Sequence, residues 1–130
     1  MIGIDSNVLI YAVIDSADPI KAAKAKKVIS DNAPVFVNTV VLAEFAWTCK
    51  QSFAMERLEI HRRLEAIVAS PEFEFAHPEA LAKAVAGYGS RMSDFDDWLI
   101  GETNLDHGCT VTLTFDKGAA KTAAFKAVPT

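Results

Sequence analysis

Five carboxylates stand at positions where they could do chemistry. Asp5 ends the apolar run "MIGID", Asp116 ends "VTLTFD", and Glu44 is the single charged residue in "VVLAEFAW". Asp94 and Asp97 are three positions apart in "SDFDDWLI", which puts them on one face of a helix. Acids in such settings bind metal ions, transfer protons or cap helices, so a structural and a chemical role must be compared for each acid.

Each acid also has an ordinary structural interpretation. Asp5 and Asp116 could cap the helices that follow them. Ser93 with Asp96 resembles a capping box, and acids in a first turn interact favourably with the helix dipole. Glu44 lies in a segment so apolar that we expect most of it to be buried. A salt bridge with a buried Arg or Lys is its structural alternative, and a metal or catalytic role explains it better.

The surrounding pattern predicts the elements that position these acids. Short apolar runs indicate strands, and apolar residues at helical spacing between them indicate helices. Strands that alternate with helices predict an α/β fold with a parallel sheet and helices on both faces. We expect strands at residues 1–4, 35–37, 73–75, 110–115 and 125–128, and helices at residues 6–13, 19–30, 40–52, 56–70, 78–88 and 93–107.

The joint placement of the acids favours a metal site. Ligands of parallel sheets bind at the carboxyl ends of the strands, where Asp5 and Asp116 are expected. Glu44 and Asp97 are expected near the N-terminal ends of helices. Four unpaired carboxylates in one pocket would repel strongly, so such a cluster requires a divalent cation. Oxygen ligands suit Mg²⁺ or Mn²⁺ better than zinc.

Further polar residues flank the four acids. Asn7 follows Asp5 by two positions, and Thr114 precedes Asp116 by two positions. Both could contact a carboxylate or its water, and together with Asp94 they are additional candidate site residues.

Length and composition narrow the class of protein. The chain of 130 residues suggests a single domain at residues 1–130, and 51% hydrophobic with 23% charged residues is typical of a globular protein. The net charge of −4 argues against a protein that coats nucleic acid, but not against an enzyme that acts on it. Without a membrane-length apolar run or a signal peptide, we expect a cytoplasmic protein. Cys49 and Cys109 are expected to be small buried residues.

Four segments together resemble a known family. They are "IDSNVLIYAV", "PVFVNTVVLAEFAW", "DFDDWLIG" and "TLTFDKGA", and they cover essentially the whole chain. In this order and spacing they are similar to the PIN-domain ribonucleases, in particular the VapC-type toxins of toxin–antitoxin pairs. The set of four segments is more specific than any one of them.

The resemblance implies a three-layer α/β/α sandwich with a central, mostly parallel sheet. It implies a metal-dependent endoribonuclease whose first to fourth acids are Asp5, Glu44, Asp97 and Asp116. It also implies a homodimer and inhibition by a small VapB-like antitoxin. Trp98 and Glu102 replace residues that are usually small in this family, which could change the local packing.

The chemistry that follows from the resemblance is hydrolysis of RNA. One or two Mg²⁺ ions would polarise the phosphate and lower the pKa of a bound water. Asp5 and Asp97 are expected as the direct ligands, and Glu44 and Asp116 as ligands directly or through water. Cations must hold the RNA elsewhere. Lys117 and Arg91 are candidates, as is a cluster on one expected helix, formed by Arg57, His61, Arg62 and Arg63.

Two other functions compete with this one. A phosphatase of the haloacid-dehalogenase type also places an acid after its first strand, but its chemistry needs a second acid where this chain has Asn7. A degenerate, non-catalytic PIN-type binding module is the second alternative, and the retention of four acids argues against it.

Overall fold

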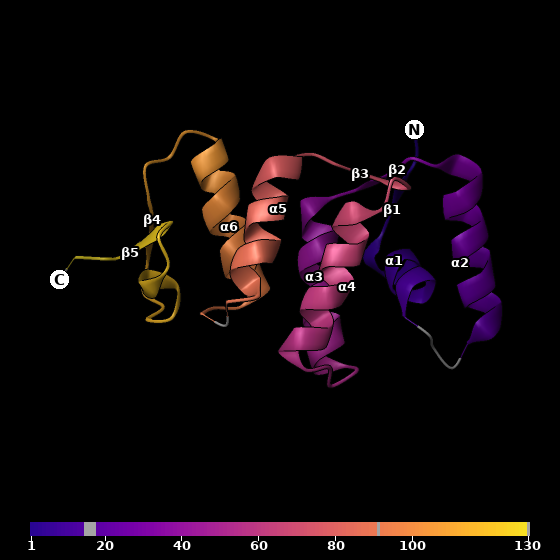
Figure 1. Ribbon diagram of the computed structural model, residues 1–130, viewed down its shortest axis with the longest axis horizontal. Helices are drawn as coiled ribbons and strands as arrows, with labels where there is room; N and C mark the ends of the chain where they lie inside the picture. The colour runs from indigo at the N-terminus through magenta and orange to yellow at the C-terminus, as the bar shows by residue number, and fades with distance from the viewer. Residues whose placement is uncertain (15–17, 91, 130) are drawn as a thin grey trace. The chain divides into compact units, whose positions relative to one another are not determined.

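The computed structural model describes residues 1–14, 18–90 and 92–129, and Figure 1 shows its helices and strands. The chain forms two compact units, Met1–Ala76 and His77–Thr130. Each unit is described below by itself. No helix among the described residues is long and apolar enough to cross a membrane.

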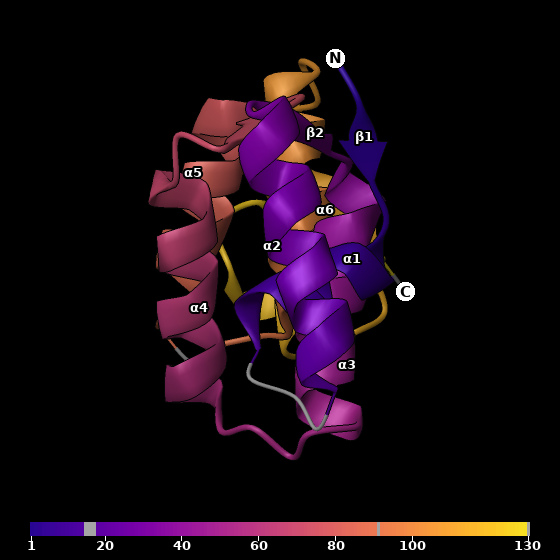
Figure 2. The ribbon, with the colours of Figure 1, turned by 90° about the vertical axis from the view of Figure 1, so that its right-hand side faces the viewer.

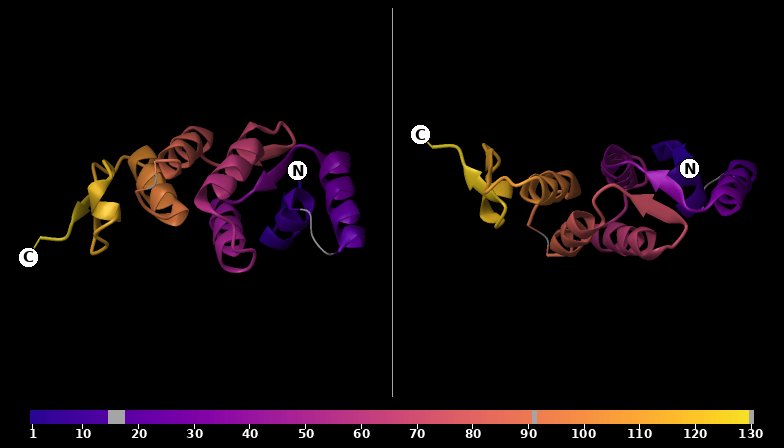
Figure 3. Two further views of the ribbon diagram at one scale, coloured as in Figure 1. Left: turned by 60° about the horizontal axis from the view of Figure 1, so that its bottom comes forward. Right: turned by 90° about the horizontal axis from the view of Figure 1, so that it is seen from above.

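Unit 1 is a parallel sheet with helices between its strands. The strand order is β1-β2-β3, and both pairings are parallel (Figure 3). Its elements are β1 (Gly3–Ile4), α1 (Ser6–Val13), α2 (Pro19–Asn32), β2 (Val35–Val37), α3 (Thr39–Gln51), α4 (Arg57–Ala69) and β3 (Phe73–Phe75).

Unit 2 consists of a helix pair followed by a second parallel strand pair. Strands β4 and β5 are joined by a single 3₁₀ turn, η1. The elements are α5 (Pro78–Tyr88), α6 (Phe95–Asp106), β4 (Thr112–Thr114), η1 (Ala119–Lys121) and β5 (Phe125–Ala127). The expected α/β class with a parallel sheet flanked by helices is confirmed.

Local capping explains where the helices of unit 1 begin. The side chains of Asp5, Asp18 and Asn38 each precede a helix and accept a hydrogen bond from a backbone N–H in its first turn. Pro19 stands at the first position of α2, where its missing N–H costs nothing. Side chains at helical spacing then close the core: Leu9, Leu42, Phe45, Ile60 and Leu64 are almost fully buried.

Three sequence-based expectations are wrong. The α6 helix begins at Phe95 with Asp94 as its N-cap, so Ser93 and Asp96 do not form the expected capping box. Cys109 is exposed, whereas Cys49 is buried as expected. The surroundings of Glu44 are the third, described with the site below.

Candidate metal centre

Asp5 lies at the carboxyl end of β1 and starts α1. Its Oδ1 accepts a hydrogen bond of 3.1 Å from the backbone N–H of Val8, so the capping interpretation is correct. The cap engages one carboxylate oxygen. Oδ2 has no hydrogen bond to a described residue, and the side chain is exposed. Capping and metal binding are therefore compatible at this residue.

Glu44 is exposed, which corrects the expectation that it is buried. The buried face of α3 carries Val41, Leu42, Phe45, Ala46 and Cys49. Glu44 lies on the other face, with Val40 four positions before it and Trp47 three after it, both 64% exposed. No described Lys or Arg forms an ion pair with Glu44, which excludes the buried salt bridge within the described residues. The helix is apolar on two faces, and only one of them is core.

The register of the sheet brings the start of α1 and the start of α3 to one edge of unit 1. Ile4 in β1 pairs with Val37 in β2, so Asp5 and Asn38 follow paired residues at the carboxyl ends of neighbouring strands. Glu44 then lies in the second turn of the helix that Asn38 caps. This is the edge at which a parallel sheet binds its ligands.

Asp97 is the most constrained acid of unit 2. The Ser93 hydroxyl donates a 2.7 Å hydrogen bond to its Oδ2, and its backbone N–H donates to Asp96 Oδ1 at 2.9 Å. Burial raises the pKa of Asp97 above the usual value, the Ser93 hydrogen bond lowers it, and the charges of Asp96, Asp116 and Asp94 raise it further. The ionised form is thus disfavoured, and a cation at this place would favour it.

Asp116 is held in the turn after β4. Its Oδ1 accepts a 2.8 Å hydrogen bond from the backbone N–H of Gly118. Thr114 Oγ1 accepts the backbone N–H of Asp116 at 2.9 Å, so this hydroxyl supports the turn. Its contact with a carboxylate through a bound water stays a prediction. A Cβ at Gly118 would lie 3.3 Å from Asp116 Oδ1, a tight contact that the glycine avoids.

The three aspartates share one local arrangement. In Asp5, Asp97 and Asp116 a neighbouring donor holds one carboxylate oxygen and leaves the other without a hydrogen bond to a described residue. Metal-binding carboxylates are oriented in the same way by outer hydrogen bonds. Sequence reasoning missed Ser93 and Gly118 in this role, although Ser93 stands four positions before Asp97, a spacing at which side chains meet in the helix expected at residues 93–107.

The acids are divided between the units. Asp5 and Glu44 belong to unit 1, and Asp94, Asp97 and Asp116 belong to unit 2. Within the described parts of the chain, no group of three or more His, Cys, Asp or Glu side chains is placed to hold a metal ion. In each unit the available donors are carboxylate oxygens, a chemistry that fits Mg²⁺ or Mn²⁺.

A model of the PIN domain family matches residues 2–125, almost the entire chain. The chain belongs to the PIN domain family. PIN domains are generally nucleases that use divalent metal ions and act on RNA or DNA. No curated protein matches the chain.

In this PIN domain, Asp94 and Asn7 lie close in sequence to the main acids. Asp94 caps α6 with its backbone, because its carbonyl accepts the N–H of Asp97 at 3.1 Å, and its side chain makes no capping hydrogen bond. Asn7 is exposed in the first turn of α1, two residues after Asp5. Both residues are exposed, and their role at the site stays a prediction.

The bulky Trp98 of this PIN domain is accommodated by a glycine. A Cβ on Gly87 in α5 would overlap the Trp98 ring, so only glycine leaves room for the indole between α5 and α6. Trp98 Nε1 is buried without a hydrogen-bond partner among the described residues. The Trp98 side chain, in place of the usual small residue, is thus accommodated by packing against Gly87 next to Asp97. Glu102, the other unusual residue, is half-buried on the same helix.

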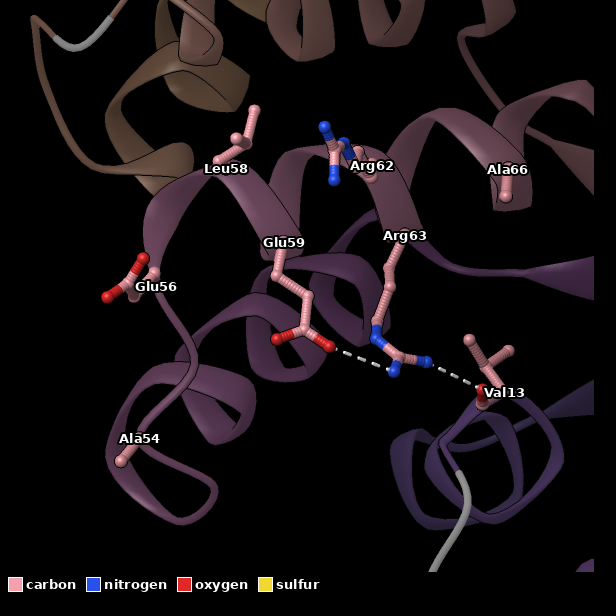
Figure 4. Close-up of a pocket in the computed structure, with 8 residues that line it drawn as sticks. All are labelled: Val13, Ala54, Glu56, Leu58, Glu59, Arg62, Arg63 and Ala66. Carbon is pink, nitrogen blue, oxygen red and sulfur yellow. Dashed lines mark hydrogen bonds and ion pairs between the residues drawn. The ribbon is translucent and has the colours of Figure 1, made fainter.

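One member of the cationic cluster on α4, Arg63, is committed to structure. Figure 4 shows Arg63 donating to the carbonyl oxygen of Val13 at 2.9 Å and to Glu59 Oε1 at 3.1 Å. These bonds tie α4 to the end of α1, beside a pocket of about 670 Å³. His61 Nδ1 is 3.5 Å from Glu65, and Arg62 is exposed.

The two RNA-contact candidates remain predictions. Lys117 is exposed and directly follows Asp116. Arg91 lies outside the described residues.

Proposed function

We propose that this PIN domain is a Mg²⁺- or Mn²⁺-dependent endoribonuclease that hydrolyses RNA phosphodiester bonds. The observation that carries the proposal is the shared arrangement of Asp5, Asp97 and Asp116, each held through one oxygen with the other available. The pKa of Asp97, raised first by burial and further by neighbouring acids, supports it, since a nearby cation favours the ionised carboxylate.

In this proposal the acids divide the work. Asp5 and Asp97 bind the metal directly, and Glu44 and Asp116 bind it directly or through water. When bound, the metal polarises the phosphate and lowers the pKa of the attacking water. Ser93 and the backbone of Gly118 keep the carboxylates oriented, and the exposed Glu44 can accept a proton from the water.

The test is cleavage of a labelled RNA by the purified full chain. We expect cleavage with Mg²⁺ or Mn²⁺ and none in excess EDTA, with recovery when metal is restored. Cleavage that persists in EDTA would overturn the metal-dependent mechanism. Binding of RNA without cleavage at any metal concentration would leave the degenerate, non-catalytic PIN module instead.

We further propose that the chain is the VapC-like toxin of a toxin–antitoxin pair, acting in the cytoplasm. The four segments that resemble VapC-type toxins support this role. Induced expression is expected to stop growth, whereas expression of Asp97→Asn is not. Co-expression of a neighbouring small gene for a VapB-like antitoxin should restore growth. Unimpeded growth at high levels of active protein would contradict the toxin role.

A homodimer is part of the same proposal. Trp47 and Phe53 are large apolar side chains on the surface of unit 1, whereas Phe45, the third residue considered for such a face, belongs to the core. Exposed aromatic residues are typical of interfaces. Light scattering should give twice the chain mass, and Trp47→Ser should shift it towards the monomer.

A further inference from the structure

A groove runs between α1 and α2 of unit 1, which lie side by side in Figure 2. Its volume is about 450 Å³. Asp5 and Asn7 line it at the start of α1, and Lys21 and Lys24 line it from α2. The groove therefore joins a candidate metal ligand to two cations, and neither of these cations is among the RNA contacts expected from the sequence.

The spacing of α2 explains why these two lysines share the groove. Lys21, Lys24, Ala25 and Val28 follow the i, i+3, i+4, i+7 pattern of one helix face. Lys26 and Lys27 are on the same helix but do not line the groove. The four lysines of α2 thus divide into a groove pair and an outer pair.

The groove pair is available for an anion. Lys24 makes no ion pair with a described residue, whereas Lys27 of the outer pair is bound to Asp31 at 2.7 Å. Lys21 Nζ lies 5.3 Å from the centroid of the Tyr11 ring. A ring face attracts an ammonium group, so Tyr11 favours the position of this charge at the groove, although Lys21 remains exposed.

The remaining lining is apolar. Val8 from α1 and Ala25 and Val28 from α2 form this part of the groove, next to the half-buried Tyr11. A cationic wall with an apolar and aromatic floor is how proteins hold single-stranded nucleic acid, because phosphates meet the cations and unpaired bases or sugars meet the floor. A duplex keeps its bases stacked inside, so it has no unpaired bases to contact the apolar side chains of the groove.

We infer that the α1/α2 groove binds a single strand of RNA and leads it to Asp5, an inference that rests on the proposed function for the identity of the strand. Lys21 and Lys24 contact its phosphates. The charge of Asp5 opposes an anion, and the bound cation removes this opposition at the place where the scissile phosphate must lie. The apolar side chains named above complete the contact with the strand.

The experiment measures RNA binding without catalysis. A short fluorescein-labelled single-stranded RNA is titrated with the full chain in EDTA at several salt concentrations, and anisotropy reports the affinity. The test variant is Lys21→Ala/Lys24→Ala, and the charge-matched control is Lys26→Ala/Lys27→Ala on the same helix. Circular dichroism checks that both variants keep the fold.

The expected difference follows from counterion release. Each phosphate contact contributes about 0.7 to the slope of log affinity against log salt for single strands. The groove variant should therefore lose about 1.4 of slope and, at about 0.1 M salt, roughly 25-fold in affinity, whereas the control should stay near the wild type. Double-stranded RNA should bind the wild type more weakly than the single strand.

Two results would overturn the inference. If both variants lose the same affinity and slope, the lysines act only as diffuse charge. If neither variant changes in affinity or slope, the groove does not hold RNA, and a protein segment becomes the alternative occupant. Because the titration contains no metal, a wild type that binds through the groove pair yet never cleaves RNA would overturn the proposed function alone.

Discussion

Asp5 in unit 1 and Asp97 in unit 2 are held by different kinds of donor. A backbone N–H of α1 holds the exposed Asp5, whereas the Ser93 side chain holds the half-buried Asp97. The charges of three neighbouring acids also act on Asp97. The contrast shows that one unit supplies an accessible carboxylate built into a helix start, and the other a crowded carboxylate that gains most from a cation.

The largest expected effect is at the crowded acid. Asp97→Asn keeps the size of the side chain and removes its charge, and we expect RNA cleavage to fall by about 10²–10³-fold, as when one electrostatic stabiliser is removed from an active site. Gel assays with Mg²⁺ measure this. Asp96→Asn is the matched control, because the new amide side chain would retain an oxygen that can accept the N–H of Asp97. An equal loss in both variants would argue against a specific role of Asp97.

At Asp5, capping and metal binding can be separated. Asparagine caps helices as well as aspartate does, so Asp5→Asn should lose cleavage as Asp97→Asn does while the free energy of unfolding stays the same. Asp5→Ala should lose cleavage and also about 1 kcal/mol of stability, because the bond to Val8 is lost. Urea denaturation compares the two variants. Full activity in Asp5→Asn would reduce Asp5 to a cap.

The Ser93 hydroxyl should have a smaller but specific effect. Ser93→Ala leaves all acids in place and frees Asp97 Oδ2, and we expect a loss of about 10–100-fold in metal affinity or activity. Ser93→Thr, which keeps the hydroxyl, should restore most of it. If alanine and threonine behave alike, Ser93 does not orient Asp97.

The smallest effect concerns pH and the metal-free protein. The pKa of Asp97 is raised on folding, so the folded state binds more protons than the unfolded state above the unfolded pKa of about 3.9. Its contribution is fully present below that pH and is lost as pH rises through the higher folded pKa. In EDTA, the wild type should lose stability over this range relative to Asp97→Asn. Parallel pH profiles would show that burial and the neighbouring charges do not raise the pKa of Asp97 on folding.

Local signals explain what can be predicted from the sequence. Asp5 and Asp116 follow strands as expected, and the caps, prolines and apolar runs that define those ends are properties of a few neighbouring residues. The strands at Val35–Val37 and Phe73–Phe75 are predictable for the same reason. Such features do not depend on how distant parts of the chain pack.

The predictions at Glu44 and Ser93 are wrong because one sequence pattern is compatible with two different structures. Val40 and Trp47 make the sequence of α3 apolar all round, but they lie on its exposed face with Glu44. Ser93 fits a capping box by spacing, yet Asp94 is the N-cap, and the Ser93 hydroxyl bonds to Asp97 instead. Which of two neighbouring residues becomes the cap depends on tertiary packing, which residue spacing along the chain does not reveal.

The central claim is that Asp5 and Asp97 both bind the metal ion that drives cleavage. Titration of Mn²⁺ into wild type, Asp5→Asn, Asp97→Asn and the double variant tests it directly, with spin resonance reporting free Mn²⁺. The account predicts that either single substitution weakens binding by at least about tenfold. The double variant should lose less than the sum of the two single losses in binding free energy, since both acids act on one ion. Unchanged Mn²⁺ affinity in both single variants would contradict it.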